Sequence, residues 1–374
     1  MSRKLARLLA AAFLSMLAVG LPAAAQQDNG RPEVRFMIHH GVSRPLREIP
    51  PVLTRDGQRV IPLRPIPRRL TQGQIDTVVQ SLAGPLVSTS SGLNFDGVGQ
   101  GAYGYTVRAA PPDTNGAVGN TQYVQWVNLS FAVFDKATGN LLYGPTAGNT
   151  LWQGSSLTAC ANNNDGDPIV QYDKAARRWV MTQLSYTGGP PYYECIAISK
   201  TSDALGPYYL YALRWTNDTF PDYPKVGIWP DGYYFTFNMF LGGLFFMGAQ
   251  VCTLDRSKML QNLDATAQCV QLSGSYDSLL PSDLDGSTLP PTGSPNYFLN
   301  LGSSSLNLWK FHVDWTNSNN TTFSGPIGIP VASFNEACSC IPQAGTTQQL
   351  DSLGDRLMYR LAYRPTSPMA MSRL

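Results

Sequence analysis

The sequence has 374 residues, of which 43% are hydrophobic and 14% charged, and its 27 lysines and arginines nearly balance its 25 aspartates and glutamates. Such a balance does not indicate a nucleic-acid-binding protein. Six cysteines occur with three histidines (His39, His40 and His312) and without paired CxxC motifs, a pattern that argues against a structural zinc site.

The first 25 residues have the pattern of a secretory signal peptide. Three basic residues (Arg3, Lys4 and Arg7) precede an apolar run over residues 8–21, and small residues follow up to Ala25. We expect cleavage after Ala25 and a secreted chain, extracellular or periplasmic. A membrane anchor is the alternative, but the apolar run is short for a bilayer, and no later segment is long and apolar enough to cross one. Cleavage would leave 24 basic residues against 25 acidic ones.

Residues 26–90 are predicted to form a Pro/Arg-rich, largely disordered lead-in. The stretch 26–70 contains seven prolines, and nine arginines against four acidic residues, without a clear apolar period. A basic arm can bind an anionic polymer, but arginine and proline also keep a disordered segment solvated, and we expect no nucleic-acid partner. For the adjacent His39 and His40 on such an arm we expect no specific metal.

From residue 91 the composition becomes typical of an all-β domain, which we place at 91–364, with an irregular tail at 365–374. Glycine, asparagine, aromatic and β-branched residues become frequent, and the one convincing helical turn is at 257–262. The clearest element is a β-hairpin with strands at 169–172 and 178–182 and a short polar turn between them.

Units similar to this hairpin recur along the chain. Each opens with an aspartate in a turn and continues into β-branched and aromatic runs. The opening aspartates are Asp113, Asp167, Asp222, Asp283 and Asp355, at steps of 54, 55, 61 and 72 residues. Each step has room for about four strands of five or six residues, about the size of a propeller blade. We therefore predict an all-β fold, a β-propeller of four-stranded blades; another barrel or a sandwich is the alternative.

The last unit is predicted to be incomplete at the C-terminus. Residues 357–363 have the pattern of the first strand of a blade, but residues 365–374 cannot supply the remaining strands. Either an early strand closes the last sheet or the chain is a fragment of a longer protein. A ring that does not close would leave bare strand edges.

All six cysteines follow the leader, and an even number in an exported chain predicts disulfides. Proximity in the sequence favours the pairs Cys160–Cys195, Cys252–Cys269 and Cys338–Cys340. The last pair would close a very small ring and is the least favoured of the three.

Several phrases of the sequence resemble a family of secreted bacterial β-propeller-like proteins without an assigned activity. They include PPDTNGAVG (111–119), NNDGDPIVQYD (163–173), FPDYPKVGIWPDGYYFTFNMF (220–240) and LDSLGDRLMYRLAYR (350–364). The resemblance covers about residues 100–364. It implies secretion and a propeller-like body, and no activity. Members of that family continue with further strands where this sequence departs at Pro365.

In a propeller the first strand of each blade lines the central channel, so the five aspartates would surround one channel mouth. They could hold Ca²⁺, supply the acid and base of a glycoside hydrolase, or cap turns by accepting backbone N–H bonds, which is the commonest role. The densest group of oxygen ligands, Asn164, Asp165 and Asp167, is a candidate Ca²⁺ site, although it does not match the EF-hand pattern.

These observations favour a secreted, non-catalytic binding or surface-interaction module with a polar or cation site at the channel mouth. Its ligand would be an extracellular molecule, with carbohydrates among the candidates. The alternative is an extracellular carbohydrate-active enzyme, similar to a glycoside hydrolase, that uses two of the aspartates. The sequence contains no phosphate loop, dinucleotide fingerprint or nucleophile elbow.

Overall fold

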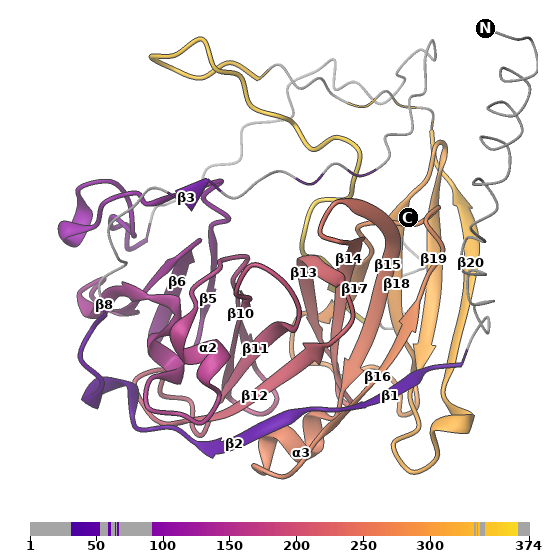
Figure 1. Cartoon of the computed structure of the whole chain (residues 1–374), viewed down its shortest axis with the longest axis horizontal. Coiled ribbons are helices and arrows are strands. Elements are labelled where there is room, and N and C mark those ends of the chain that lie inside the picture. The colour runs from indigo at the N-terminus through magenta and orange to yellow at the C-terminus, as the bar shows by residue number, and fades with distance from the viewer. Residues whose placement is uncertain are drawn as a thin grey trace, which may run out of the picture. The chain divides into compact units, whose positions relative to one another are not determined.

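A computed structural model of the chain describes residues 31–52, 59–60, 64, 66, 92–332, 334, 336 and 341–365. The predicted signal peptide, residues 67–91, Cys338, Cys340 and residues 366–374 lie outside the described part. Within it, the prediction of an all-β protein is confirmed (Figure 1). No described helix is long and apolar enough to reach across a membrane.

Four antiparallel sheets follow one another along the chain. The first contains β5 (Asn115–Val118), β6 (Gln122–Val127), β7 (Ser130–Asp135) and β8 (Leu141–Ala147). The second contains β9 (Ile169–Asp173), β10 (Arg178–Ser185), β11 (Tyr192–Ser199) and β12 (Tyr208–Trp215). The third contains β13 (Thr219–Ile228), β14 (Tyr233–Leu241), β15 (Phe245–Leu254) and β16 (Thr266–Gln271). The fourth contains β17 (Leu280–Leu284), β18 (Asn296–Leu301), β19 (Ser305–His312) and β20 (Thr322–Pro330).

The remaining elements are short. The helical turns are η1 (Leu46–Glu48), η2 (Ala102–Gly104), η3 (Gly148–Trp152), α2 (Thr158–Asn162), α3 (Arg256–Leu260) and η4 (Ser318–Asn320). Two short strands, β3 (Arg59–Val60) and β4 (Ala109–Ala110), pair in parallel. The predicted hairpin is confirmed as β9 and β10, and the predicted helical turn as α3, where the Asp255 carboxylate accepts a hydrogen bond from the Lys258 N–H.

The start of the described chain corrects the prediction of a disordered lead-in. Strand β1 (Glu33–Phe36) pairs with β16, and β2 (Ile38–Val42) pairs with β12, so one segment supplies the outermost strand of two neighbouring sheets (Figure 1). Met37, between the two strands, is buried and its N–H donates to the Ala265 carbonyl. This segment was overlooked because strands this short carry little periodic signal among prolines and arginines.

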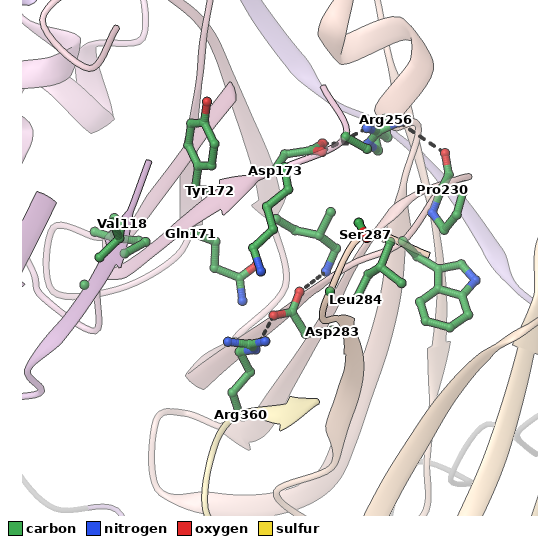
Figure 2. A pocket seen from close by; sticks show the side chains of 18 of the residues that line it. Val118, Gln171, Tyr172, Asp173, Pro230, Arg256, Asp283, Leu284, Ser287 and Arg360 are labelled. Carbon is green, nitrogen blue, oxygen red and sulfur yellow. Dashed lines mark hydrogen bonds and ion pairs between the residues drawn. The ribbon is translucent and has the colours of Figure 1, made fainter. Parts of the chain in front are cut away.

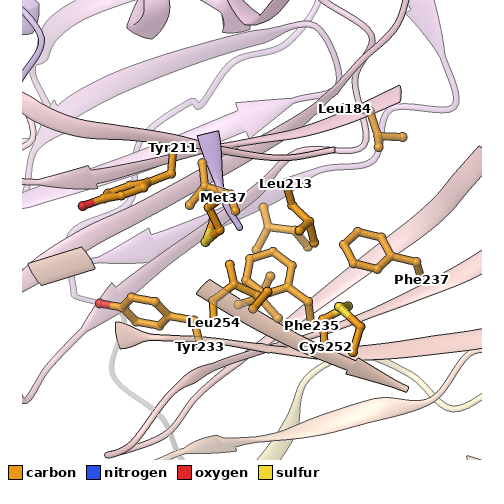
Figure 3. Packing of buried hydrophobic residues seen from close by; sticks show 14 of the residues in the cluster. Met37, Leu184, Tyr211, Leu213, Tyr233, Phe235, Phe237, Cys252 and Leu254 are labelled. Carbon is orange, nitrogen blue, oxygen red and sulfur yellow. A yellow bond between two sulfur atoms is a disulfide. The ribbon is translucent and has the colours of Figure 1, made fainter. Parts of the chain in front are cut away.

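Neighbouring sheets pack face to face through buried clusters. Because side chains alternate across a strand, β14 sends Tyr233, Phe235 and Phe237 to the second sheet and Tyr234 to the fourth (Figure 3). Fully burying one such side chain stabilises the fold by about 1.5–3 kcal/mol. This two-sided burial explains the nearly continuous apolar runs in the central strands.

The first strands of the four sheets, β5, β9, β13 and β17, form the inner edge of this array, and successive members contact one another. One side chain links each neighbouring pair: Asn115 Oδ1 accepts from the Val170 N–H at 2.7 Å, Gln171 Nε2 donates to the Val226 carbonyl at 2.7 Å, and Asp283 Oδ1 accepts from the Ile228 N–H at 2.9 Å. Strands β13 and β17 approach closely at Gly227, where an added Cβ would lie 2.4 Å from the Ser282 carbonyl oxygen. The array is compatible with a β-propeller-like fold, and no sheet closes on itself among the described residues.

Strand β21 (Leu361–Tyr363) is much shorter than the predicted strand over residues 357–363, and it pairs in parallel with β17. Two predicted disulfides are present. Cys160 of α2 is bonded to Cys195 of β11, and Cys252 and Cys269 face each other across β15 and β16. The predicted Cys338–Cys340 pair lies outside the described residues.

Candidate functional site

A residue with left-handed backbone lies shortly before β5, β9 and β17 and at the bulge inside β13, and these four residues correct the positions assigned to the repeat. Asp113, Asp167, Tyr223 and Ser278 have φ angles of 39°, 47°, 55° and 46°, a conformation uncommon for residues other than glycine. Asp113 and Asp167 are the repeated positions that the sequence indicated. Asp222 is one residue early, and in the fourth unit the repeated position is Ser278 rather than Asp283, which lies inside β17.

The turns at Asp113, Asp167 and Tyr223 and the segment 352–359 line a cavity of about 520 Å³, which we call the strand-start cavity; the turn at Ser278 is not part of its lining. Asp113, Asp167 and Lys225 all line it. Lys225 reaches it because β13 contains a bulge in which Tyr223 and Pro224 together face one residue of β14. Bulges redirect side chains in this way and are frequent beside functional sites.

Asp113 and Asp167 carry carboxyl groups that share an environment short of water. Burial, and then the charge of Asp167, raise the pKa of Asp113 to about 7, against the effects of Lys225 and of a 2.8 Å hydrogen bond from Asn128 Nδ2. Burial also raises the pKa of Asp167, whose Oδ2 accepts from the Tyr223 N–H at 3.2 Å. Two carboxyl groups that repel each other in one cavity both keep a proton to higher pH than an ordinary aspartate does.

The cluster continues behind Asp167. The carboxyl groups of Asp167 and Asp222 are hydrogen bonded, and burial, together with the charge of Asp167, raises the pKa of Asp222 to about 7. Arg64 approaches Asp222 with 3.6 Å between Nη1 and Oδ1. Burial raises the pKa of the fully buried Glu194 to about 8, and the charge of Asp167 adds to this increase.

Lys225 is the cation at the centre of this cluster. Burial lowers the pKa of its amine to about 8, and the charges of Asp167 and Asp113 oppose that decrease. Its Nζ donates to the Pro224 carbonyl at 2.8 Å and lies 3.5 Å from the centroid of the Tyr223 ring. Arg356 approaches the same ring, with Cζ 5.0 Å from the centroid, and is bonded to its neighbour Asp355.

The five predicted aspartates are therefore only partly brought together. Asp113, Asp167 and Asp222 interact, and Asp355 reaches their cavity through Arg356 and Tyr223. Asp283 does not join them, because it accepts the Ile228 N–H and pairs with Arg360 at 2.5 Å between Oδ2 and Nε.

The residues of the candidate Ca²⁺ site have separate partners. Asn164 Nδ2 donates to the Leu129 carbonyl at 2.8 Å, and Asp165 Oδ2 accepts from the Tyr186 N–H at 2.7 Å. Asp167 belongs to the strand-start cavity. Within the described ranges, no three histidine, cysteine, aspartate or glutamate residues are arranged to hold a metal ion.

A second cavity, of about 780 Å³, lies further along the same strands, and we call it the strand-end cavity (Figure 2). Tyr359 and Asn115 line both cavities. The Tyr359 hydroxyl donates to the Val226 carbonyl at 3.3 Å and accepts from Gln171 Nε2. Burial raises the pKa of Tyr359, so its hydroxyl stays neutral at the boundary that the two cavities share.

Comparison of the sequence with models of protein families finds no match, and comparison with curated proteins finds none either. The site must therefore be interpreted from its own chemistry. Sequence reasoning missed Lys225, Glu194 and Arg356. The sequence signal for Lys225 is the phrase Asp-Tyr-Pro-Lys at 222–225. It places a lysine two residues after Tyr223, the turn residue that corresponds to an aspartate in the first two units.

Proposed function

We propose that this chain is a secreted, non-catalytic binding protein with a β-propeller-like body, and that its strand-start cavity takes a positively charged ligand. The four consecutive sheets with contacting first strands support the propeller-like arrangement. The leader pattern and the two disulfides support secretion. The resemblance of the motif phrases to secreted propeller-like proteins agrees with both.

The observation that carries the ligand assignment is the convergence of Asp113, Asp167 and Asp222 around one lysine. Burial raises the pKa values of all three, and the charge of Asp167 adds to the increase at Asp113 and Asp222, although Lys225 opposes it. A cation that enters the cavity lets these carboxyl groups ionise and gains charge-assisted contacts. The shared chemistry is positive charge. An organic ammonium group is favoured, because the described residues contain no set of three carboxyl groups arranged to hold a metal ion, and Ca²⁺ is the alternative.

Binding is favoured over glycoside hydrolysis by the carboxyl geometry. Glycosidases hold their two carboxyl groups about 5 Å or more apart, so that the sugar fits between them. Asp167 and Asp222 are hydrogen bonded to each other, which leaves no room for a glycosidic bond between them.

The test is a thermal melt of the secreted chain with calcium chloride or choline chloride at about pH 8 and about pH 5.5. We expect one cation to raise the midpoint at the higher pH and to lose most of this effect at the lower pH, where Asp113 and Asp222 are protonated. Asp113→Asn should weaken binding about tenfold or more. The control is Asp264→Asn, because the Asp264 side chain is 97% exposed and lies outside the cavity lining. A wild-type midpoint that neither cation shifts, or an equal shift in Asp113→Asn, contradicts the proposal.

A further inference from the structure

The strand-end cavity differs from the strand-start cavity in that all its charges are paired. Asp173 is bonded to Arg256 at 2.7 and 3.0 Å, and Figure 2 shows this pair and the Asp283–Arg360 pair on different parts of the wall. Lys174, the remaining charged residue of the lining, pairs with Asp285 at 3.4 Å. A charged ligand would therefore find no free counter-charge among the described residues.

Two buried polar atoms of residues that line this cavity have no hydrogen-bond partner among the described residues. Gln171 is 5% exposed; its Nε2 has two partners, but its Oε1 has none in the described part of the chain. The Tyr172 hydroxyl is likewise buried without a hydrogen bond. A buried polar atom without a partner costs about 1–3 kcal/mol. A ligand with hydroxyl groups would remove that cost, because it can donate to Gln171 and both donate to and accept from Tyr172.

Apart from Asn115 and Ser287, the rest of the lining is apolar or aromatic. Val118, Leu284 and Leu289 contribute aliphatic surface, and Tyr123 and Trp229 contribute rings. Val118 and Leu289 are each 52% exposed at the rim, where a ligand could enter. A volume of about 780 Å³ is within the range of sites for small molecules, about 300–1,000 Å³.

From these features we infer that the strand-end cavity binds a neutral mono- or disaccharide. A neutral ligand suits a cavity whose charged side chains are all paired. Its hydroxyl groups can hydrogen bond to Gln171 Oε1 and Tyr172 Oη, and the apolar C–H face of a sugar can pack against the aliphatic and aromatic wall. This site is separate from the strand-start cavity and does not depend on the cation proposed there.

The experiment is a titration of the secreted full chain with glucose, galactose, N-acetylglucosamine and maltose at millimolar concentrations, by calorimetry and saturation-transfer NMR. We expect at least one of these sugars to bind. Tyr172→Phe, which keeps the ring and its edge contact with Trp179, should weaken binding about 3- to 10-fold. Leu289→Trp should fill the rim and reduce binding more than tenfold.

Two controls separate this site from a structural effect and from the other cavity. Leu263→Trp places the same side chain at a residue that is 50% exposed and outside the cavity lining, and it should bind sugar as the wild type does. Asp113→Asn, in the strand-start cavity, should also bind sugar normally. If Leu289→Trp does not fold, Tyr172→Phe carries the test. The inference is overturned if none of the four sugars binds, or if binding is lost in Asp113→Asn and kept in Tyr172→Phe.

Discussion

The two cavities share the inner strands β5, β9 and β13, and the strand-end cavity also reaches β17, yet their charged side chains are partnered in opposite ways. In the strand-end cavity each acidic side chain has its own arginine, as Asp173 has Arg256. In the strand-start cavity Asp113 and Asp167 share Lys225, and Asp222 behind them is hydrogen bonded to Asp167 and approached by Arg64. Paired charges hold a wall in place, whereas unbalanced charges leave a cavity that a ligand or a proton can complete. We therefore expect a bound cation to change the protonation of the strand-start cavity more than that of the strand-end cavity.

The largest expected effect comes from breaking a pair in the strand-end cavity. Arg256→Met would leave the fully buried Asp173 carboxylate with hydrogen bonds only from Tyr233 and the Ala176 N–H among its described partners. Removing one partner of a buried ion pair costs about 3–5 kcal/mol. Urea unfolding should show this loss as a lower midpoint. An unchanged midpoint would mean that the pair is not needed to hold the wall.

A substitution in the strand-start cavity should change the free energy of unfolding in the opposite direction. The folded-state pKa of Asp113, about 7, lies above its ordinary value of 3.8, so its favourable contribution is present at low pH and is lost as pH rises from about 4 to about 7. Asp113→Asn removes the charge that is disfavoured at higher pH. We expect it to stabilise the fold by about 1–3 kcal/mol at pH 8 and to have little effect near pH 4. Urea unfolding at both pH values measures this, and destabilisation at pH 8 would contradict it.

A smaller effect is expected where the two cavities meet. Tyr359→Phe removes the hydroxyl that bonds to Val226 and Gln171. The free energy of unfolding measured in urea should fall by about 1 kcal/mol, because one hydrogen-bonding group is lost while the ring stays in place. A loss as large as that of Arg256→Met would show that the hydroxyl, rather than the ring, maintains this boundary.

The smallest effect is expected for Arg364→Ala. The Arg364 side chain is 72% exposed and pairs with Asp285 at 2.7 Å. Solvent screens such pairs, so the urea midpoint should stay within experimental error of the wild type. This variant is the surface control for Arg256→Met, and a comparable loss in both would show that burial does not distinguish the two pairs.

The sequence predicted those features that follow from local pattern. The strands of the β9–β10 hairpin begin at the predicted residues, 169 and 178, because apolar and β-branched runs between turns are a strong signal. The two disulfides followed from spacing. For the site, Asp113 and Asp167 were recognised because an aspartate precedes a strand in both.

The rest depended on contacts between distant segments. Strands β1 and β2 form only because β16 and β12 offer free edges more than 160 positions later in the chain. Asp283 shares the aspartate signal but lies inside a strand, and its partner Arg360 comes from the end of the described chain. Lys225 owes its position to a bulge, and Glu194 reaches the cluster from β11 across the sheet. No local pattern contains these pairings.

The most direct test of this account is a carboxyl ¹³C NMR titration of the secreted chain, with Asp113→Asn and Asp222→Asn used to assign the signals. We predict that Asp113 and Asp222 titrate near pH 7, well above ordinary aspartates, and that the cation selected by the melts moves both midpoints downward. Titration midpoints near pH 4 for both residues, unchanged by cations, would contradict the proposal that the strand-start cavity binds a cation through carboxyl groups with raised pKa values.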